Sequence, residues 1–262
     1  MNTALPSSTI VIARNNTLTE QIEIFMVVRH HQIDFAAGAL VFPGGKVSSH
    51  DHDARIREYC VGKLPEDELQ LALQVAAIRE AFEESGFLLA RHKHGATITS
   101  ETLQKLQPYR NMLQENACSM ADFMIKEELV LTLDELHHFA HWITPPMVPK
   151  RFDTHFYLVR APEGQQGQHD GSESVDSLWI SPQTALRRAD EGSLKIIFPT
   201  RMNLLRLARF ASVEDAITDC QQQAVVAITP WTEQKEAGLM LCIPEHAGYE
   251  LTEMPVEMVM RS

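Results

Sequence analysis

The chain has 262 residues, of which 44% are hydrophobic and 22% are charged. A chain of this length and composition can bury a sizeable core, which argues against intrinsic disorder. The formal net charge of −12 argues against a basic nucleic-acid-binding surface and against attraction to an anionic membrane. The four cysteines are widely spaced without a CxxC pair, and no stretch approaches a membrane span, so we expect a cytoplasmic protein with reduced thiols.

The N-terminal segments predict strands that lead into a glycine turn. Residues 8–14 and 22–30 are rich in β-branched side chains, which is typical of strands. In residues 38–46, "GALVFPGGK", a short strand runs into a Pro-Gly-Gly turn, whose adjacent glycines let the backbone come close to another group. Residues 47–66 are polar and irregular, and they predict an inserted loop with room for one helical turn.

Residues 66–86 carry the strongest helix signal in the chain. Four apolar side chains recur at i, i+4, i+7 and i+11 and so form one helical stripe, namely Leu71, Val75, Ile78 and Phe82. Three carboxylates lie opposite this stripe near the end of the helix, namely Glu80, Glu83 and Glu84. Gly86 stands where a helix C-cap is expected.

The remaining segments predict further helices and strands within the same domain. Residues 99–135 read as helical pieces broken at Pro108, within a small helical insertion at about 93–135. The pattern predicts strands at 138–145, 151–162 and 175–181, and a mobile hairpin loop at 164–174. It predicts helices at 181–191, 199–210 and 212–223, and a final hairpin made of 224–230 and 238–244. Because no linker divides the chain, we expect residues 1–262 to form one layered α/β domain, with C-terminal helices and a hairpin at about 199–250.

The three carboxylates of the predicted helix call for a compensating charge. Glu80, Glu83 and Glu84 are three or four residues apart, so their side chains converge and repel one another. Their place near a helix C-terminus adds to this cost. A divalent cation such as Mg²⁺ would turn the repulsion into binding, because it prefers carboxylate oxygens. The alternative is a solvated acidic helix face balanced by nearby lysines or arginines.

These residues resemble the signature of the Nudix hydrolase family, GX5EX7REUXEEXGU with U apolar. "REAFEESGF" at 79–87 is similar to the second half of the signature, and Gly45 in "FPGGK" is similar to its first glycine. Between Gly45 and Arg79 the chain has 34 positions where the signature has 14, so about 20 residues are inserted. Leu71 stands eight positions before Arg79, where the signature has a glutamate, and Glu68 is the nearest carboxylate.

One branch of the family tolerates such an insertion. The long Nudix proteins that resemble coenzyme A diphosphatases carry a similar insertion, followed by stretches like those at 77–89 and 141–159 of this chain. The resemblance covers most of residues 8–210 and implies an α/β/α sandwich around a mixed sheet, with loop and helical insertions. It implies a metal-dependent hydrolase that cleaves a diphosphate linkage in a nucleoside diphosphate derivative, with coenzyme A or an acyl-coenzyme A as the favoured substrate.

The resemblance also implies roles for individual residues. Glu80 and Glu84 would bind Mg²⁺ or Mn²⁺ directly, and Glu83 would be a third or water-mediated ligand. The backbone carbonyl of Gly44 or Gly45 would complete the site. Arg79 would orient a glutamate, and either Glu83 or a carboxylate from another segment would serve as the base.

Three cations beside predicted strand ends are candidates for substrate binding, namely Arg29, Lys46 and Arg151. Arginine offers a planar donor fork to phosphate and lysine a point charge. Each could equally be an ordinary surface cation.

Two further alternatives stay open at this point. A non-catalytic Nudix-fold module that binds a nucleotide metabolite need not keep the three glutamates, so their presence favours the enzyme. In "HHFAH", His137 and His141 have a spacing that could bind zinc on a helix, but the segment reads equally well as a strand with ordinary histidines. We expect a small nucleotide-derived substrate as partner, and a homodimer is compatible with these features.

Overall fold

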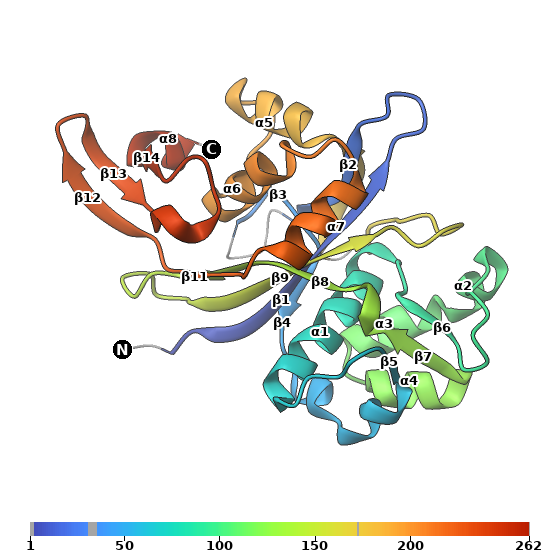
Figure 1. Ribbon diagram of the computed structural model, residues 1–262. Helices are drawn as coiled ribbons and strands as arrows, with labels where there is room; N and C mark the ends of the chain where they lie inside the picture. The colour runs from blue at the N-terminus through green and yellow to red at the C-terminus, as the bar shows by residue number, and fades with distance from the viewer. Residues whose placement is uncertain (1–2, 31–35, 172, 262) are drawn as a thin grey trace.

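A mixed eight-stranded sheet forms the centre of the computed structural model, which describes residues 3–30, 36–171 and 173–261 (Figure 1). The main path of the sheet runs in the order β10 (Ser174–Ile180), β2 (Ile22–Arg29), β1 (Leu5–Asn15), β9 (Phe152–Arg160), β8 (His137–Ile143) and β11 (Ala227–Ile228). Two short strands lie off this path, β3 (Leu40–Val41) beside β2 and β4 (Gly44–Lys46) beside β1. β1 is parallel to β9 and antiparallel to β2, so the predicted mixed sheet is confirmed.

Alternating side chains of β1 enter two separate hydrophobic clusters. Ile10 and Ile12 pack with the helix α1 (Glu68–Ser85) on one face, whereas Val11 and Ala13 pack with the C-terminal helices on the other. Successive side chains of a strand point to opposite faces, so this central strand contributes to both cores. Figure 1 shows α1 on one side of the sheet and the C-terminal helices on the other, which confirms the predicted α/β/α layers.

Capping residues explain where α1 begins and where it ends. Asp67 caps the first turn by accepting a hydrogen bond from the amide of Leu69. Gly86 ends the helix in the left-handed region at φ 74°, as the sequence predicts. Between them almost every residue from Leu71 onward is buried, including the three glutamates. The helix therefore has no solvated acidic face, and that alternative is wrong.

The two glycines of the predicted Pro-Gly-Gly turn lie in a strand, directly after a bend at Pro43. Gly44–Lys46 form β4, which pairs antiparallel with Ser7–Thr9 of β1. A Cβ at Gly44 would lie 2.5 Å from the carbonyl oxygen of Ser8 and 2.7 Å from the Cα of Thr9. Glycine at position 44 therefore allows the backbones of β4 and β1 to approach each other closely.

The two insertions pack together next to α1 and contain more regular structure than predicted. Residues 47–66 form two 3₁₀ helices, η1 (Ser49–His52) and η2 (Ala54–Tyr59), and the strand β5 (Cys60–Val61). The second insertion contains the expected helices α2 (Ser100–Leu106), α3 (Pro108–Gln114) and α4 (Met120–Glu127), and a 3₁₀ helix, η3 (Leu133–Glu135). It also contains a strand that the sequence did not predict, β7 (Leu129–Thr132), which pairs with β5 and β6 (Ala90–His92).

The described residues of the segment 164–174, which are 164–171, 173 and 174, do not form the predicted hairpin loop. The segment joins β9 to β10, and these strands are separated in the sheet by β1 and β2. The segment is attached to the end of α1, because the amide of Gln168 donates to the carbonyl of Ser85 and the side chain of Gln165 bonds both backbone groups of Leu88.

The C-terminal helices match the prediction, but the final hairpin does not. The helices are α5 (Pro182–Asp190), α6 (Phe198–Leu207) and α7 (Val213–Gln222). Within 224–230, β11 pairs in parallel with β8 instead of with 238–244. The hairpin consists of β12 (Trp231–Lys235) and β13 (Gly238–Cys242), followed by η4 (Glu245–Ala247), β14 (Glu253–Pro255) and α8 (Val256–Arg261). Among the described residues, no helix is long and apolar enough to cross a membrane.

The packing of α1 yields a stability prediction. Phe82 is fully buried and stacks on Phe123 of α4, with ring centroids 5.6 Å apart. Phe82→Ala is therefore expected to lower the free energy of unfolding by about 3–5 kcal/mol in a urea titration. Leu69→Ala, in the exposed first turn of the same helix, should change it little. Equal effects of the two substitutions would contradict this packing of α1.

Candidate metal and active site

Arg79 lies at the centre of the candidate site and uses all five of its N–H groups. Its Nε and Nη2 donate to the two carboxylate oxygens of Asp51, at 2.8 and 3.0 Å. Its Nη1 donates to Glu80 at 2.8 Å and to Glu83 at 3.2 Å. The second N–H of Nη2 donates to the backbone carbonyl of Lys46 at 2.9 Å. One guanidinium thus joins η1, β4 and the last turns of α1.

Asp51 is the site residue that the sequence analysis missed. It is 1% exposed, and its place in η1 is fixed by a capping box with Ser48. Leu71 packs in the core instead, and Glu68 lies exposed in the first helical turn. Asp51 stands six positions after Gly45, which is the spacing that the Nudix signature gives between its first glycine and its first glutamate. Counting six positions forward from Gly45, instead of eight positions backward from Arg79, would have identified Asp51 as the matching residue.

The glycines of β4 place the backbone of this strand next to two of the glutamates. A Cβ at Gly45 would lie 2.7 Å from the carboxyl carbon of Glu80, so a larger residue there would displace this carboxylate from its position. The amide of Gly44 donates to Glu84 at 3.0 Å. Two of the predicted metal ligands and both glycines are therefore adjacent in the structure.

The glutamates lie in an environment that disfavours their charge. They are only 3–8% exposed, and burial raises the pKa of Glu83 to about 7. Burial also raises the pKa of Glu80, and burial with the neighbouring charge of Glu80 raises that of Glu84 well above its usual range. Asp51 and the glutamates outnumber the single guanidinium that binds them. A buried set of carboxylate oxygens with excess negative charge fits a hard divalent cation such as Mg²⁺ or Mn²⁺.

The predicted substrate-binding cations lie in different surroundings. Arg29 ends β2, and its positive charge acts on the pKa of Glu84. The Nε of Arg29 is buried without a hydrogen-bond partner among the described residues. The side chain of Lys46 is exposed beside the site. Arg151 donates from Nε to the carbonyl of Thr144 at 2.9 Å, so its guanidinium helps to close the β8–β9 hairpin.

Arg110 of α3 is a second residue that sequence reasoning missed. Its Nε and Nη2 donate to the backbone carbonyl of Glu83, at 3.1 and 2.9 Å, and Nη2 also donates to the carbonyl of Gln168. A guanidinium at this end of α1 satisfies a carbonyl and complements the helix dipole. No local pattern marks this arginine, because its partners belong to two distant segments.

A cavity of about 390 Å³ opens beside Arg110. It lies between α2, α3 and the 164–168 segment, next to the C-terminus of α1. Most of its lining side chains carry amide, hydroxyl or guanidinium groups, among them Ser100, Gln104, Gln107, Gln166 and Gln168.

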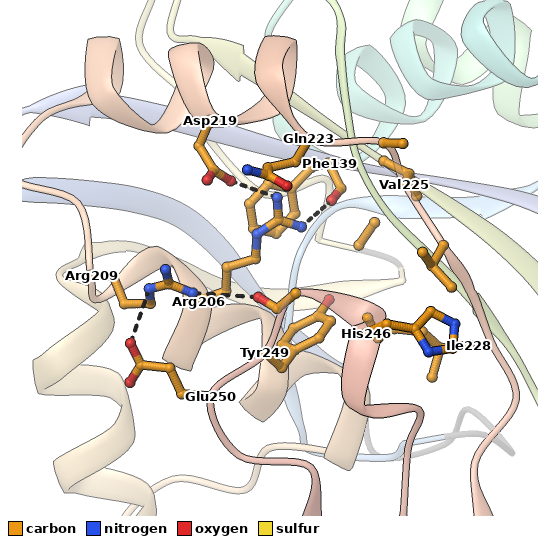
Figure 2. A pocket seen from close by; sticks show the side chains of 15 residues that line it. Phe139, Arg206, Arg209, Asp219, Gln223, Val225, Ile228, His246, Tyr249 and Glu250 are labelled. Atoms are coloured by element: carbon orange, nitrogen blue, oxygen red, sulfur yellow. Dashed lines mark hydrogen bonds and ion pairs between the residues drawn. The ribbon is translucent and has the colours of Figure 1, made fainter.

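A second cavity, of about 260 Å³, lies on the opposite side of the sheet and contains none of the predicted site residues (Figure 2). Arg206 of α6 points into it and donates to the carbonyl of Phe139 and to Asp219. Arg209 pairs with Glu250 at its rim. Both guanidiniums already have internal partners, so this cavity offers little unpaired charge to a ligand.

The histidines of "HHFAH" lie on a strand, so a helical zinc pair is wrong. His141 lies instead across from His155 of β9 and hydrogen bonds to Asp153. His138 hydrogen bonds to His155 at 3.1 Å. Burial lowers the pKa of His138 and of His155 to about 4, so both rings are neutral at pH 7.

Comparisons with known proteins agree with this fold. A family model described as the NUDT19 Nudix domain matches residues 53–207. The human protein named acyl-coenzyme A diphosphatase NUDT19 is 28% identical over 179 residues, which cover 65% of this chain and 47% of that protein. The Xenopus laevis protein of the same name is 24% identical over 274 residues, covering 88% of this chain and 72% of that protein. This chain therefore spans only about half the length of the human relative.

A solved structure gives the same result for the fold. The crystal structure of a NUDIX hydrolase from Alicyclobacillus acidocaldarius superposes with a TM-score of 0.74 and 27% sequence identity. The match covers 83% of this chain and 97% of that chain. Most of this chain therefore shares its fold with another solved protein.

The contacts of Arg79 predict that Asp51 is essential for stability. Asp51→Ala would leave a buried guanidinium without its bidentate partner, so the free energy of unfolding should fall by about 3–5 kcal/mol. Glu101→Ala removes an exposed ion pair with Lys105 and serves as the control, with little expected change. Urea titrations followed by circular dichroism measure both. An Asp51→Ala variant as stable as the parent would contradict the buried pair.

Proposed function

Because this chain belongs to the Nudix hydrolase family, in the branch of the NUDT19 Nudix domain, we propose that it is a metal-dependent diphosphatase. It would cleave a diphosphate linkage in a nucleoside diphosphate derivative by attack of water at phosphorus. The observation that supports this most is the buried set of glutamates that Arg79 gathers against the glycines of β4. A protein that only binds nucleotides would have no need of so costly a cluster.

The same cluster supports a ligand set for Mg²⁺ or Mn²⁺. Glu80 and Glu84 would hold the ion directly, Glu83 would be a third or water-mediated ligand, and the carbonyl of Gly45 would complete the site. When bound, such an ion would neutralise phosphate charge and lower the pKa of the attacking water. Arg79 would fix the directions of Glu80 and Glu83, because its Nη1 already bonds one oxygen of each.

The protein itself would contribute proton transfer and phosphate binding. Glu83, whose pKa burial raises to about 7, is suited to accept a proton from water near neutral pH. Arg29 has a buried Nε without a described partner and lies close enough to act on Glu84, so it would bind a phosphate oxygen. Lys46 would add a point charge at the exposed side of β4. Arg151 would contribute only if the substrate reaches the β8–β9 hairpin.

Coenzyme A or an acyl-coenzyme A is the substrate class we propose. Two relatives carry the name acyl-coenzyme A diphosphatase. The 390 Å³ cavity next to the end of α1 lies within the size range of ligand pockets, and its amide and hydroxyl groups suit a hydrogen-bonding chain such as pantetheine. We also propose that residues 1–262 act as one domain and that the protein is cytoplasmic. Measurement of its mass in solution would distinguish a homodimer from a monomer.

Glu84→Gln tests the metal assignment. The substitution keeps the shape of the side chain but removes its charge, so turnover with Mg²⁺ or Mn²⁺ should fall more than roughly 100-fold, since losing only the partner of a ligand typically costs 10–100-fold. Release of nucleotide from coenzyme A, acyl-coenzyme A, ADP-ribose, NADH and dinucleoside polyphosphates measures this. Glu68→Gln, exposed at the start of the same helix, is the control.

Two outcomes would overturn the proposal. Full activity of Glu84→Gln would contradict the metal site. Tight binding of one compound without turnover of any would favour the non-catalytic module.

Arg29→Gln tests the phosphate contact. Loss of this charge should raise KM more than it lowers kcat, because the arginine binds the phosphate before and during the reaction alike. The exposed Arg187→Gln serves as the control, since its side chain lies on α5. An unchanged KM for Arg29→Gln would remove Arg29 from the binding site.

A further inference from the structure

A second group of metal-ligating side chains lies on β8 and β9. His141 and His155 are directly opposite each other in the antiparallel ladder, and their rings stack with centroids 3.9 Å apart. Asp153 stands two residues before His155, so both side chains point to the same face of the sheet. The Nε2 of His141 hydrogen bonds to Oδ1 of Asp153, and the Nε2 of His155 lies 3.9 Å from the same oxygen.

We propose that His141, Asp153 and His155 form a binding site for a zinc-class divalent cation. Each residue offers one ligand atom, and these atoms all lie within 4.8 Å of one another. Zinc binds imidazole nitrogen and carboxylate oxygen at about 2.0–2.2 Å, so its ligand atoms stand roughly 3–4 Å apart. Side-chain rotations that open the stacked imidazole pair would bring the ligand atoms to that spacing. Three protein ligands leave a fourth position for water.

His138 supports this site from outside. Its Nε2 lies 3.1 Å from Nδ1 of His155, and this bond leaves Nε2 of His155 directed toward Asp153. A histidine that binds a metal through one ring nitrogen usually donates the other N–H to a fixed acceptor. The strand register that brings His138 beside His155 therefore provides the orienting partner that an imidazole ligand needs.

The histidine site is separate from the glutamate cluster, and the two differ in the type of ligand atom they offer to a metal. Gly45 pairs with Ser8, Ser8 with His155, and His155 with His141, so these residues form a row across four strands. Two strand spacings place His155 about 10 Å from Gly45. Carboxylate oxygens select hard ions such as Mg²⁺, whereas imidazole nitrogens favour Zn²⁺, Co²⁺ or Ni²⁺. The fold thus offers two sites with different metal preferences, and this inference does not depend on the proposed hydrolysis.

Binding at this site would tie β8 to β9. Both strands belong to the central sheet, and β9 also pairs with β1. A ligand that binds only the folded protein raises its stability, so added Zn²⁺ should raise the melting temperature.

Calorimetric titration of Zn²⁺ into the full chain, in buffer with excess Mg²⁺, tests the proposal. We expect one bound Zn²⁺ per chain, and Co²⁺ in its place should give the absorption spectrum of a low-symmetry nitrogen and oxygen site. Asp153→Asn and His155→Gln should abolish this binding and the thermal stabilisation. His138→Gln should weaken binding by about 10- to 100-fold, because it removes only the orienting partner.

Two variants serve as matched controls. His137→Gln alters another histidine of β8, one that lies opposite Leu158, whose side chain packs in the cluster on the other face of the sheet. Glu84→Gln alters the carboxylate cluster. Both should bind Zn²⁺ as the parent does. Asp153 is 37% exposed in its side chain, so Asp153→Asn is expected to fold even if a histidine variant does not.

Three results would overturn the proposal. The first is no Zn²⁺ binding by the parent, which would leave only a hydrogen-bonded histidine cluster. The second is binding that Asp153→Asn and His138→Gln leave unchanged. The third is binding that Glu84→Gln abolishes, which would assign the Zn²⁺ to the glutamates.

Discussion

The hydrogen bonds of Arg79 are the constraint on which the candidate site depends. Three buried glutamates near the C-terminal end of α1 repel one another and oppose the helix dipole. A guanidinium with a rigid fork of donors offsets part of this cost and fixes the direction of each carboxylate it binds. Its bidentate partner Asp51 comes from η1, and its carbonyl partner Lys46 comes from β4. The segment that directly follows β4 therefore contributes to the site.

The backbone sets how closely α1 approaches the sheet. The hydroxyl of Ser8 donates to the carbonyl of Leu73 at 2.5 Å and so attaches β1 to the first half of the helix. Farther along, Gly45 lets the carboxylate of Glu80 lie against β4, and the amide of Gly44 binds Glu84. These contacts hold Glu80 and Glu84 next to the backbone of β4. The residual negative charge is what a divalent cation would neutralise, and Arg29 would provide the nearby positive charge for a phosphate.

Local patterns predicted much of this structure, and non-local contacts explain the errors. The stripe of α1 and the convergence of its glutamates follow from helical periodicity, and its cap follows from the left-handed conformation that glycine adopts readily. Asp51 was missed because an insertion moved it away from the arginine that it binds. The strand β7 follows directly after α4, and only its pairing with β5 and β6 makes it a strand. The C-terminal pairing was wrong because β-propensity identifies strands without identifying partners. The histidine cluster depends on the register of β8 and β9, which no sequence spacing reveals.

The central claim is that Arg79 and β4 hold the glutamates ready for a hard cation. A crystal structure of the protein grown with Mn²⁺, with anomalous diffraction to locate the ion, tests it most directly. We expect an anomalous peak bound by Glu80, Glu84 and the carbonyl of Gly45, with Arg79 still paired to Asp51. A peak elsewhere with no Mn²⁺ at the glutamates, or an Arg79 turned away from Asp51, would contradict it.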